Sequence, residues 1–183
     1  MNNRVDQRVM PLDDIGKISF FKVHLPYRIS MLNTYKKVVP WNCLVKNYRI
    51  PNQLAIDLCI CACEASRMEC RTLIEFMGLG VNKKHELVQK RKYLKSNDEK
   101  SYEVKIVDLG GKWINIYDLT NDEMNLLVKV YETANKSTAH LTHGDPYGGS
   151  PLILNDGVNL IIRLLEENLY GIVGEKITGY NIT

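Results

Sequence analysis

The chain has 183 residues, of which 45% are hydrophobic and 25% charged, and its formal net charge is +3. This length and composition are typical of one globular domain with a sizeable core, and the net charge is too small to indicate nucleic-acid binding by itself. Asp57, Glu64 and Arg67 interrupt the longest apolar stretch, so we expect no membrane span. The N-terminus lacks the apolar centre of a signal peptide, and we therefore expect a cytoplasmic protein.

The hydrophobic periodicity predicts a mainly α protein: an antiparallel four-helix bundle with a small β-hairpin insertion, formed as a single domain by residues 1–183. The first segment, residues 1–20, shows no steady period and is expected to be an arm. The predicted helices cover residues 26–48, 51–77, 120–141 and 150–170. The third of them follows a capping box, in which Thr120 and Glu123 satisfy free backbone donors.

A change of period after residue 101 predicts the hairpin. The segments YEVKIVDL and KWINIYDL alternate on either side of Gly110 and Gly111, and we expect a hairpin over residues 102–118. The preceding basic segment, KKHELVQKRKYLK at 83–95, is expected to be a solvated connector. It could also contact RNA, a phosphate-bearing ligand or an acidic protein.

Five cysteines are present, and four of them lie within the second predicted helix. A secreted disulfide framework would place cysteines in separate loops, and a C-x-C-x-C run along one helix does not direct its sulfurs toward one zinc ion. We therefore interpret the cysteines as small buried hydrophobic residues in a reducing compartment. They are Cys43, Cys59, Cys61, Cys63 and Cys70.

A charged seam follows the same helix and is the most specific pattern in the sequence. Asp57, Glu64, Arg71 and Glu75 fall within one narrow stripe of a helical wheel, with Arg67 at its edge. The seam is compatible with a solvated face, a structural ion network that sets the register, or a catalytic or ligand-binding site. Asp57 is expected in apolar surroundings, whereas the pairs farther along suit a half-exposed face.

A second candidate site is NKSTAHLTHG, residues 135–144, where Lys136, His140 and His143 lie at the end of a predicted helix. His140 could act as an acid or base near neutral pH. The alternative is that these cationic groups interact favourably with the helix dipole. No Glu-x-x-His pattern supports a helical di-metal site, and we expect neither metal nor cofactor.

Two segments, EASRMECRTLIEFMGLG at 64–80 and ANKSTAHLTHG at 134–144, carry a resemblance to uncharacterised bacterial helical proteins of the integron gene-cassette type. The wider chain distantly resembles HEPN-like helical bundles. Catalytic members of that superfamily are ribonucleases with an Arg-x₄₋₆-His motif, usually acting across a dimer. Here Asn135 or Lys136 stands where that arginine would be, so the match to the motif is incomplete.

The leading hypothesis is therefore a non-enzymatic homodimer that binds a partner or small ligand through residues such as Glu64, Arg67, Lys136 and His143. The alternative, implied by the resemblance, is a metal-independent ribonuclease. In it His140 is the general base, Arg71 or Lys136 stabilises phosphate charge, and Glu75 orients one of them. This alternative predicts that His140 lies within about 6 Å of Arg71.

Overall fold

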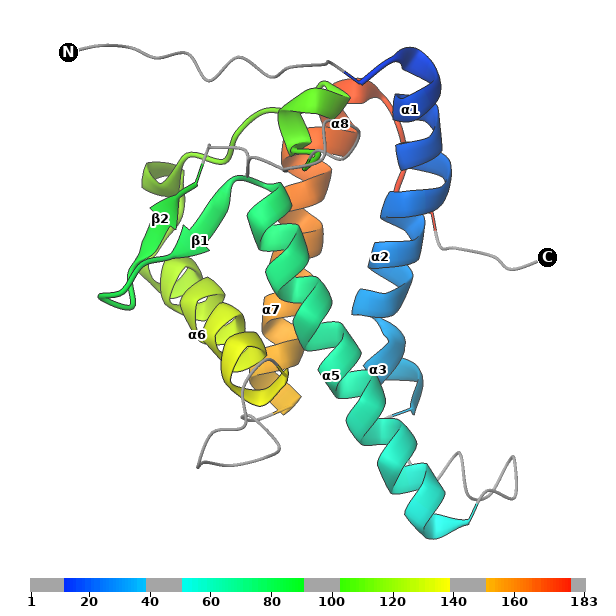
Figure 1. The fold of residues 1–183 in the computed structure, drawn as a ribbon. Helices are drawn as coiled ribbons and strands as arrows, with labels where there is room; N and C mark the ends of the chain where they lie inside the picture. Colours follow the sequence, from blue (N-terminus) through cyan, green and yellow to red (C-terminus); the bar gives the residue numbers. More distant parts are fainter. Residues whose placement is uncertain (1–11, 39–50, 91–102, 139–150, 179–183) are drawn as a thin grey trace.

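The computed structural model describes residues 12–38, 51–90, 103–138 and 151–178, and it shows the predicted mainly α fold with one small antiparallel hairpin (Figure 1). The elements, in chain order, are α1 (Asp14–Ser19), η1 (Phe20–His24), α2 (Leu25–Leu32), α3 (Thr34–Val38), α5 (Asn52–Phe76), β1 (Leu79–Val81), β2 (Leu87–Gln89), η2 (Ile106–Leu109), η3 (Ile116–Asp118), α6 (Asn121–Thr138), α7 (Pro151–Leu165), η4 (Glu166–Tyr170) and α8 (Gly171–Val173).

The helices form four rods, and consecutive rods run in opposite directions (Figure 1). The first rod comprises α1, η1, α2 and α3, and the last comprises α7, η4 and α8. The long helix α5 is central, because it packs against α2 and α3 on one side and against α6 and α7 on the other. Its N-terminal part extends past the ends of α6 and α7 in Figure 1.

The first rod begins earlier than the sequence predicts, so the expected arm over residues 1–20 is wrong from Asp14 onward. The side chain of Asp13 caps this helix by accepting a hydrogen bond from the amide of Gly16 at 2.7 Å. Pro26 lies within the continuing rod, directly after the π-helical turn η1. Proline lacks the amide donor of a helix and clashes with the carbonyl four residues earlier, and the wider π-helical turn accommodates it.

The other predicted helices agree closely with the structure where it describes them. Helix α5 covers Asn52–Phe76, within one residue of the prediction at each end. Thr120 and Glu123 form the predicted capping box at the start of α6: the Thr120 amide donates to Oε2 of Glu123, and the Glu123 amide donates to Oγ1 of Thr120. The last rod continues to Val173, and Gly174 ends it with a φ of 76°.

The hairpin lies at a different place from the predicted one. Strands β1 and β2 pair with Leu79 opposite Gln89 and Val81 opposite Leu87. Strand β2 lies inside the segment 83–95 that we expected to be a connector, and β1 lies just before it. Their turn is built by Asn82, whose side chain accepts from the amides of Lys84 and Glu86. These three-residue strands are too short to show an alternating pattern in the sequence.

Residues 103–118 contain the two 3₁₀ turns η2 and η3 instead of the predicted hairpin. Local caps provide hydrogen-bond partners for backbone groups there. The carboxylate of Asp108 accepts from the Lys105 amide at 2.7 Å, which closes η2. Gly110 follows with a φ of 90°, and the amide of Lys112 donates to the carbonyl of Asn168 in the last rod. Short polar side chains that bond nearby amides compete in this way with strand pairing.

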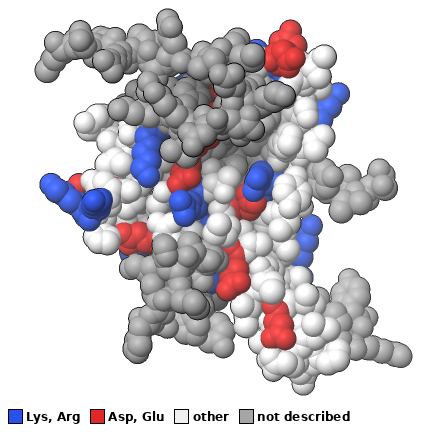
Figure 2. Space-filling model, viewed as in Figure 1, with Lys and Arg blue, Asp and Glu red and all other residues white. Residues whose placement is uncertain are grey.

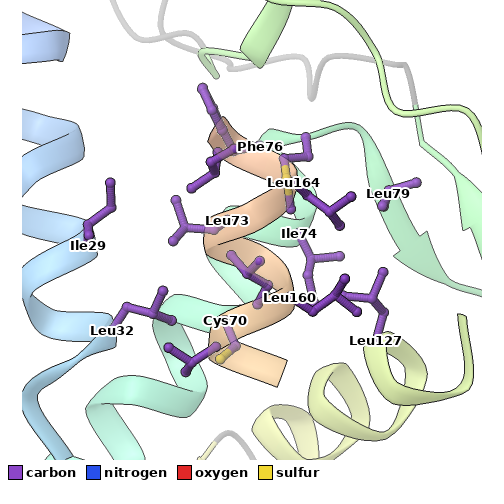
Figure 3. Close-up of a cluster of buried hydrophobic side chains, with 14 of the residues drawn as sticks. Ile29, Leu32, Cys70, Leu73, Ile74, Phe76, Leu79, Leu127, Leu160 and Leu164 are labelled. Atoms are coloured by element: carbon purple, nitrogen blue, oxygen red, sulfur yellow. The ribbon is translucent and has the colours of Figure 1, made fainter. Parts of the chain in front are cut away.

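The core lies along the inner faces of all four rods and the hairpin (Figure 3). In it, Leu32 from the first rod, Leu73 and Ile74 from α5, Leu127 from α6 and Ile161 from α7 are almost completely buried. Burying such side chains stabilises the fold by about 1.5–3 kcal/mol each. Among the described residues, no helix is both long and apolar enough to cross a membrane.

Candidate functional site

The residues of the charged seam all lie on α5, but the N-terminal end of the seam is exposed. Asp57 is exposed and accepts a hydrogen bond from Gln53 at 2.8 Å. Our expectation that Asp57 lies in apolar surroundings is therefore wrong, because Ile56 and Leu58 beside it are exposed as well. Figure 2 shows that basic and acidic side chains alternate over α5 and its neighbours on this face, among the described residues.

Farther along the seam, burial increases. Glu64 is half-buried, and Arg67 is buried, which differs from the half-exposed position that the helical wheel indicates for it. Burial raises the pKa of the thiols of Cys63 and Cys70, and the nearby positive charge of Arg67 lowers it by a smaller amount. The net pKa of both thiols is raised, so they are poor nucleophiles at neutral pH.

Arg71 and Glu75 meet as predicted, and a tyrosine from α6 joins them. Nε of Arg71 donates to Oε1 of Glu75 at 3.1 Å, and the hydroxyl of Tyr131 donates to the same oxygen at 2.5 Å. The guanidinium carbon of Arg71 lies 5.5 Å from the centre of the Tyr131 ring. The carboxylate is thus held between a cation and a phenol, in an arrangement that fixes its orientation.

Two lysines complete this cluster. Nζ of Lys90 lies 5.5 Å from the centre of the Tyr131 ring and 3.4 Å from its hydroxyl. The aliphatic part of the Lys90 side chain packs over Gly80. A Cβ at position 80 would lie 2.4 Å from Cδ of Lys90, so only glycine leaves room for the lysine in this position. Nζ of buried Lys105 donates to the carbonyl of Glu75 at 2.9 Å and pairs with the carboxylate of Glu103.

The cluster raises the pKa of Tyr131. Burial, together with the hydrogen bond to Glu75 and its negative charge, raises the pKa of Tyr131 to about 12, although Arg71 opposes the shift. Burial lowers the pKa of Arg71, but the carboxylate of Glu75 and the contact with Tyr131 outweigh it and leave that pKa raised. Tyr131 therefore stays a neutral hydrogen-bond donor at physiological pH, and it is a poor general base there.

A second ion pair joins the first rod to α5. Nη1 of Arg28 donates to Oε1 of Glu69 at 2.7 Å. The Glu69 side chain is buried, and its other oxygen, Oε2, has no hydrogen-bond partner among the described residues. Burial raises the pKa of Glu69, and Arg28 opposes this shift through its hydrogen bond and its charge. Arg28 is therefore tied by one nitrogen to an anion that the fold has removed from water.

A cavity of about 190 Å³ opens beside Arg28, between η1, α2, α5 and the segment before η2. Polar and charged side chains line its walls and come from opposite sides: His24 and Arg28 from the first rod, and Thr72, Glu75 and Glu103 from the other. Its apolar lining consists of Phe20, Leu25, Leu73, Phe76 and Val104. Glu75 therefore connects the cavity to the Tyr131 cluster.

The second predicted site falls mostly outside the described residues. His140 and His143 lie outside them, and of Lys136 the structure gives only its place in α6. The predicted proximity of His140 to Arg71 is therefore still a prediction. Among the described residues, no three His, Cys, Asp or Glu side chains are placed to hold a metal ion.

The basic segment 83–95 is described up to Lys90 and is not the connector that we expected. Lys83 and Lys84 are exposed in the hairpin turn, and His85 there adopts a φ of 62° and pairs with Glu132 of α6. Of the cysteines, Cys70 is buried as expected, whereas Cys61 is exposed. Cys43 lies outside the described residues.

The sequence reasoning missed most residues of this region as site residues, among them Arg28, Glu69, Lys90 and Tyr131. A signal for Glu69 does exist, because a helical wheel places it on the same face as Ala62, Ser66 and Leu73, which is the core face. Tyr131 similarly continues the apolar stripe of α6. Lys90 and Arg28 reach the region through contacts between separate elements, which no local pattern encodes.

Comparisons with protein-family models, with curated proteins and with solved structures find no match for this chain.

Proposed function

We propose that this protein is a binding protein that self-associates through an exposed apolar stripe that runs along α5 from Leu54 to Met68. The stripe consists of Leu54, Leu58, Cys61, Ala65 and Met68, which follow one another at alternating spacings of four and three residues. This is the spacing of the contact positions of a coiled coil. Leu54 is 48% exposed, and Leu58 and Met68 are each 39% exposed.

A second copy of the chain is the partner that fits this stripe best. In a symmetric dimer the same surface must be complementary to itself. An antiparallel pairing that places Leu58 opposite Met68 also brings Asp57 near Arg71 of the second copy, so opposite charges flank the apolar contact. The projection of this part of α5 beyond α6 and α7 leaves room for such an approach (Figure 1).

A protein partner also agrees better with the charge distribution than a nucleic acid does. Proteins that bind nucleic acid present basic residues gathered on one face. On the face shown in Figure 2, described side chains of both signs alternate instead. Mixed charges around an apolar contact are typical of the surfaces between proteins.

The decisive experiment replaces Leu58 by aspartate and measures the mass in solution by sedimentation velocity across a concentration series. Removing about 1–2 kcal/mol of apolar contact from each copy weakens a symmetric dimer by about 2–4 kcal/mol, or roughly a hundredfold in Kd. We expect a concentration-dependent dimer for the wild type and a monomer for Leu58→Asp.

The control variant is Ile15→Asp, because Ile15 is 78% exposed on α1, away from the stripe. It should dimerise like the wild type. A wild-type protein that is monomeric at every concentration would remove this proposal, and equal weakening by both variants would locate the interface elsewhere.

A second proposal, metal-independent RNA cleavage, is favoured by one observation: Glu75 holds and orients the guanidinium of Arg71 at 3.1 Å, as that mechanism requires. His140 would be the general base. The test compares RNA cleavage by the wild type and by His140→Ala in the presence of a chelator. Loss of cleavage in the variant supports the mechanism, and equal rates or an inactive wild type end it.

A further inference from the structure

The cavity beside Arg28 is lined by donors from the first rod and by carboxylates from α5 and the segment before η2, and it is independent of the dimer stripe. On the first rod, Arg28 uses Nη1 to bind Glu69, and no other hydrogen bond from its guanidinium is made to a described residue. The side chain is 46% exposed and lines the cavity, so its remaining N–H groups are accessible to a ligand. The buried carboxylate of Glu69 holds this cation at the cavity wall.

The opposite wall is acidic. Glu75 gives Oε1 to Arg71 and Tyr131, whereas Oε2 accepts no hydrogen bond from a described residue. Glu103 lies beside it and is paired with Lys105, which is itself anchored on the carbonyl of Glu75. The acidic wall is therefore preorganised by contacts from behind the cavity, as a binding site requires.

The size and lining of the cavity restrict the ligand. A volume of about 190 Å³ is below the roughly 300–1,000 Å³ of sites for drug-sized ligands, so the cavity suits a small ligand. Apolar side chains, including Leu73 and Phe76, line the space between the charged walls. Such a cavity suits a small molecule that carries a negative group at one end and a positive group at the other.

We infer that this cavity binds a small zwitterion of the α-amino acid class. The carboxylate of the ligand lies against Arg28, its ammonium group lies against Glu75 and Glu103, and its side chain lies over Leu73 and Phe76. Loss of either charge-assisted contact is expected to weaken binding by about tenfold or more, and charge at both ends distinguishes the zwitterion from simple acids and simple amines.

The test is isothermal titration calorimetry of the full chain with a panel of the proteinogenic amino acids. For any amino acid that binds, its N-acetyl derivative and its methyl ester are titrated as well, because each lacks one of the two charges. We expect one or a few free amino acids to bind and both blocked forms to bind at least about tenfold more weakly. No binding by any member of the panel, or equal binding of the blocked forms, overturns the inference.

Variants assign the site. Arg28→Gln should weaken binding by about tenfold or more. Because this change alone leaves the buried Glu69 without its cation, the double variant Arg28→Gln/Glu69→Gln is measured beside it, with thermal unfolding as the check on folding. The matched control is Arg163→Gln, since Arg163 pairs with Glu123 and Glu167 away from the cavity. Unchanged binding by the folded double variant would overturn the assignment.

Discussion

Glu75 shows how one side chain can serve both the fold and a site. One of its carboxylate oxygens accepts hydrogen bonds from Arg71 and Tyr131, and its carbonyl accepts from Lys105. These contacts join α5 to α6 and to the segment before η2. An arginine–glutamate pair one helical turn apart contributes only about 0.2–0.5 kcal/mol on an exposed helix, but the buried tyrosine converts it into a tertiary contact.

The raised pKa of Tyr131 predicts a pH dependence of stability. A tyrosine in the unfolded chain has the ordinary pKa of 10.0, whereas the pKa of Tyr131 in the fold is about 12. Its contribution is therefore fully present below about pH 10 and is lost as the pH rises toward 12. We expect the free energy of unfolding to fall across this interval by an amount on the order of 2 kcal/mol from this group.

Chemical denaturation at a series of pH values measures this loss, and Tyr131→Phe removes it. The variant should therefore lose less stability than the wild type between pH 10 and 12. Tyr117→Phe is the control, because Tyr117 is 87% exposed and should leave the slope unchanged. If wild type and Tyr131→Phe lose the same free energy over this interval, the tyrosine does not carry the shift.

At the scale of elements, the junction between α5 and β1 depends on a glycine. Gly78 has a φ of 79°, and a Cβ there would lie 2.3 Å from Cε3 of Trp113. Gly78→Ala therefore combines a left-handed backbone with a clash against a large ring. We expect a loss of about 2–4 kcal/mol in the free energy of unfolding, of which about 1–2 kcal/mol is backbone strain and the rest overpacking.

Gly174 supplies the matched comparison for this prediction. It has a φ of 76°, but a Cβ there would meet nothing within 4 Å, so Gly174→Ala isolates the backbone strain. Urea unfolding should show the smaller loss, about 1–2 kcal/mol, for this variant. Similar losses for the two alanine variants would mean that the Trp113 ring moves aside without cost.

The helices were predictable because their signals are local. The apolar period of α5 and the Thr120–Glu123 box both lie within the segments that they specify. The hairpin was not predictable, because the alternating residues 103–118 find partners in Asp108 and in the last rod, which the period alone does not reveal. The early start at Asp14 was signalled only by the cap of Asp13.

The candidate site was predictable only along one helix. Arg71 and Glu75 are four residues apart, and their pairing follows from helix geometry. Tyr131 and Lys90 are brought to them by the packing of α6 and the hairpin, so their roles depend on tertiary structure. Asp57 was misplaced because a wheel shows which face a residue occupies but not where a helix leaves the bundle.

At the scale of the whole molecule, the protein has a packed end and a projecting end. Towards its C-terminus, α5 is enclosed by the other rods and carries the partly buried ionic cluster and the cavity. Towards its N-terminus it presents the exposed apolar side chains of the stripe, among them Leu54 and Leu58. A group of apolar side chains on one exposed surface often marks an interaction site. This observation is the basis of the proposed dimer.

The antiparallel geometry makes a prediction of its own about Asp57. Its described contact is a hydrogen bond from Gln53 on an exposed surface, so Asp57→Lys should change the stability of the monomer by less than about 0.5 kcal/mol. In the dimer the lysine would face Arg71 of the second copy and turn attraction into repulsion. We expect Kd to rise by about threefold to tenfold at low salt, and by less at high salt.

Asp118→Lys is the control for this change, because Asp118 is also exposed, also accepts one amide hydrogen bond, from Asn115, and lies outside α5. Both variants alter the net charge equally, so general repulsion between copies affects them alike. A parallel pairing would place Asp57 opposite Ala62, and Asp57→Lys would then weaken the dimer no more than Asp118→Lys. Sedimentation of the two variants at low and high salt therefore distinguishes the orientations, and a selective, salt-sensitive loss for Asp57→Lys is the result that the antiparallel dimer requires.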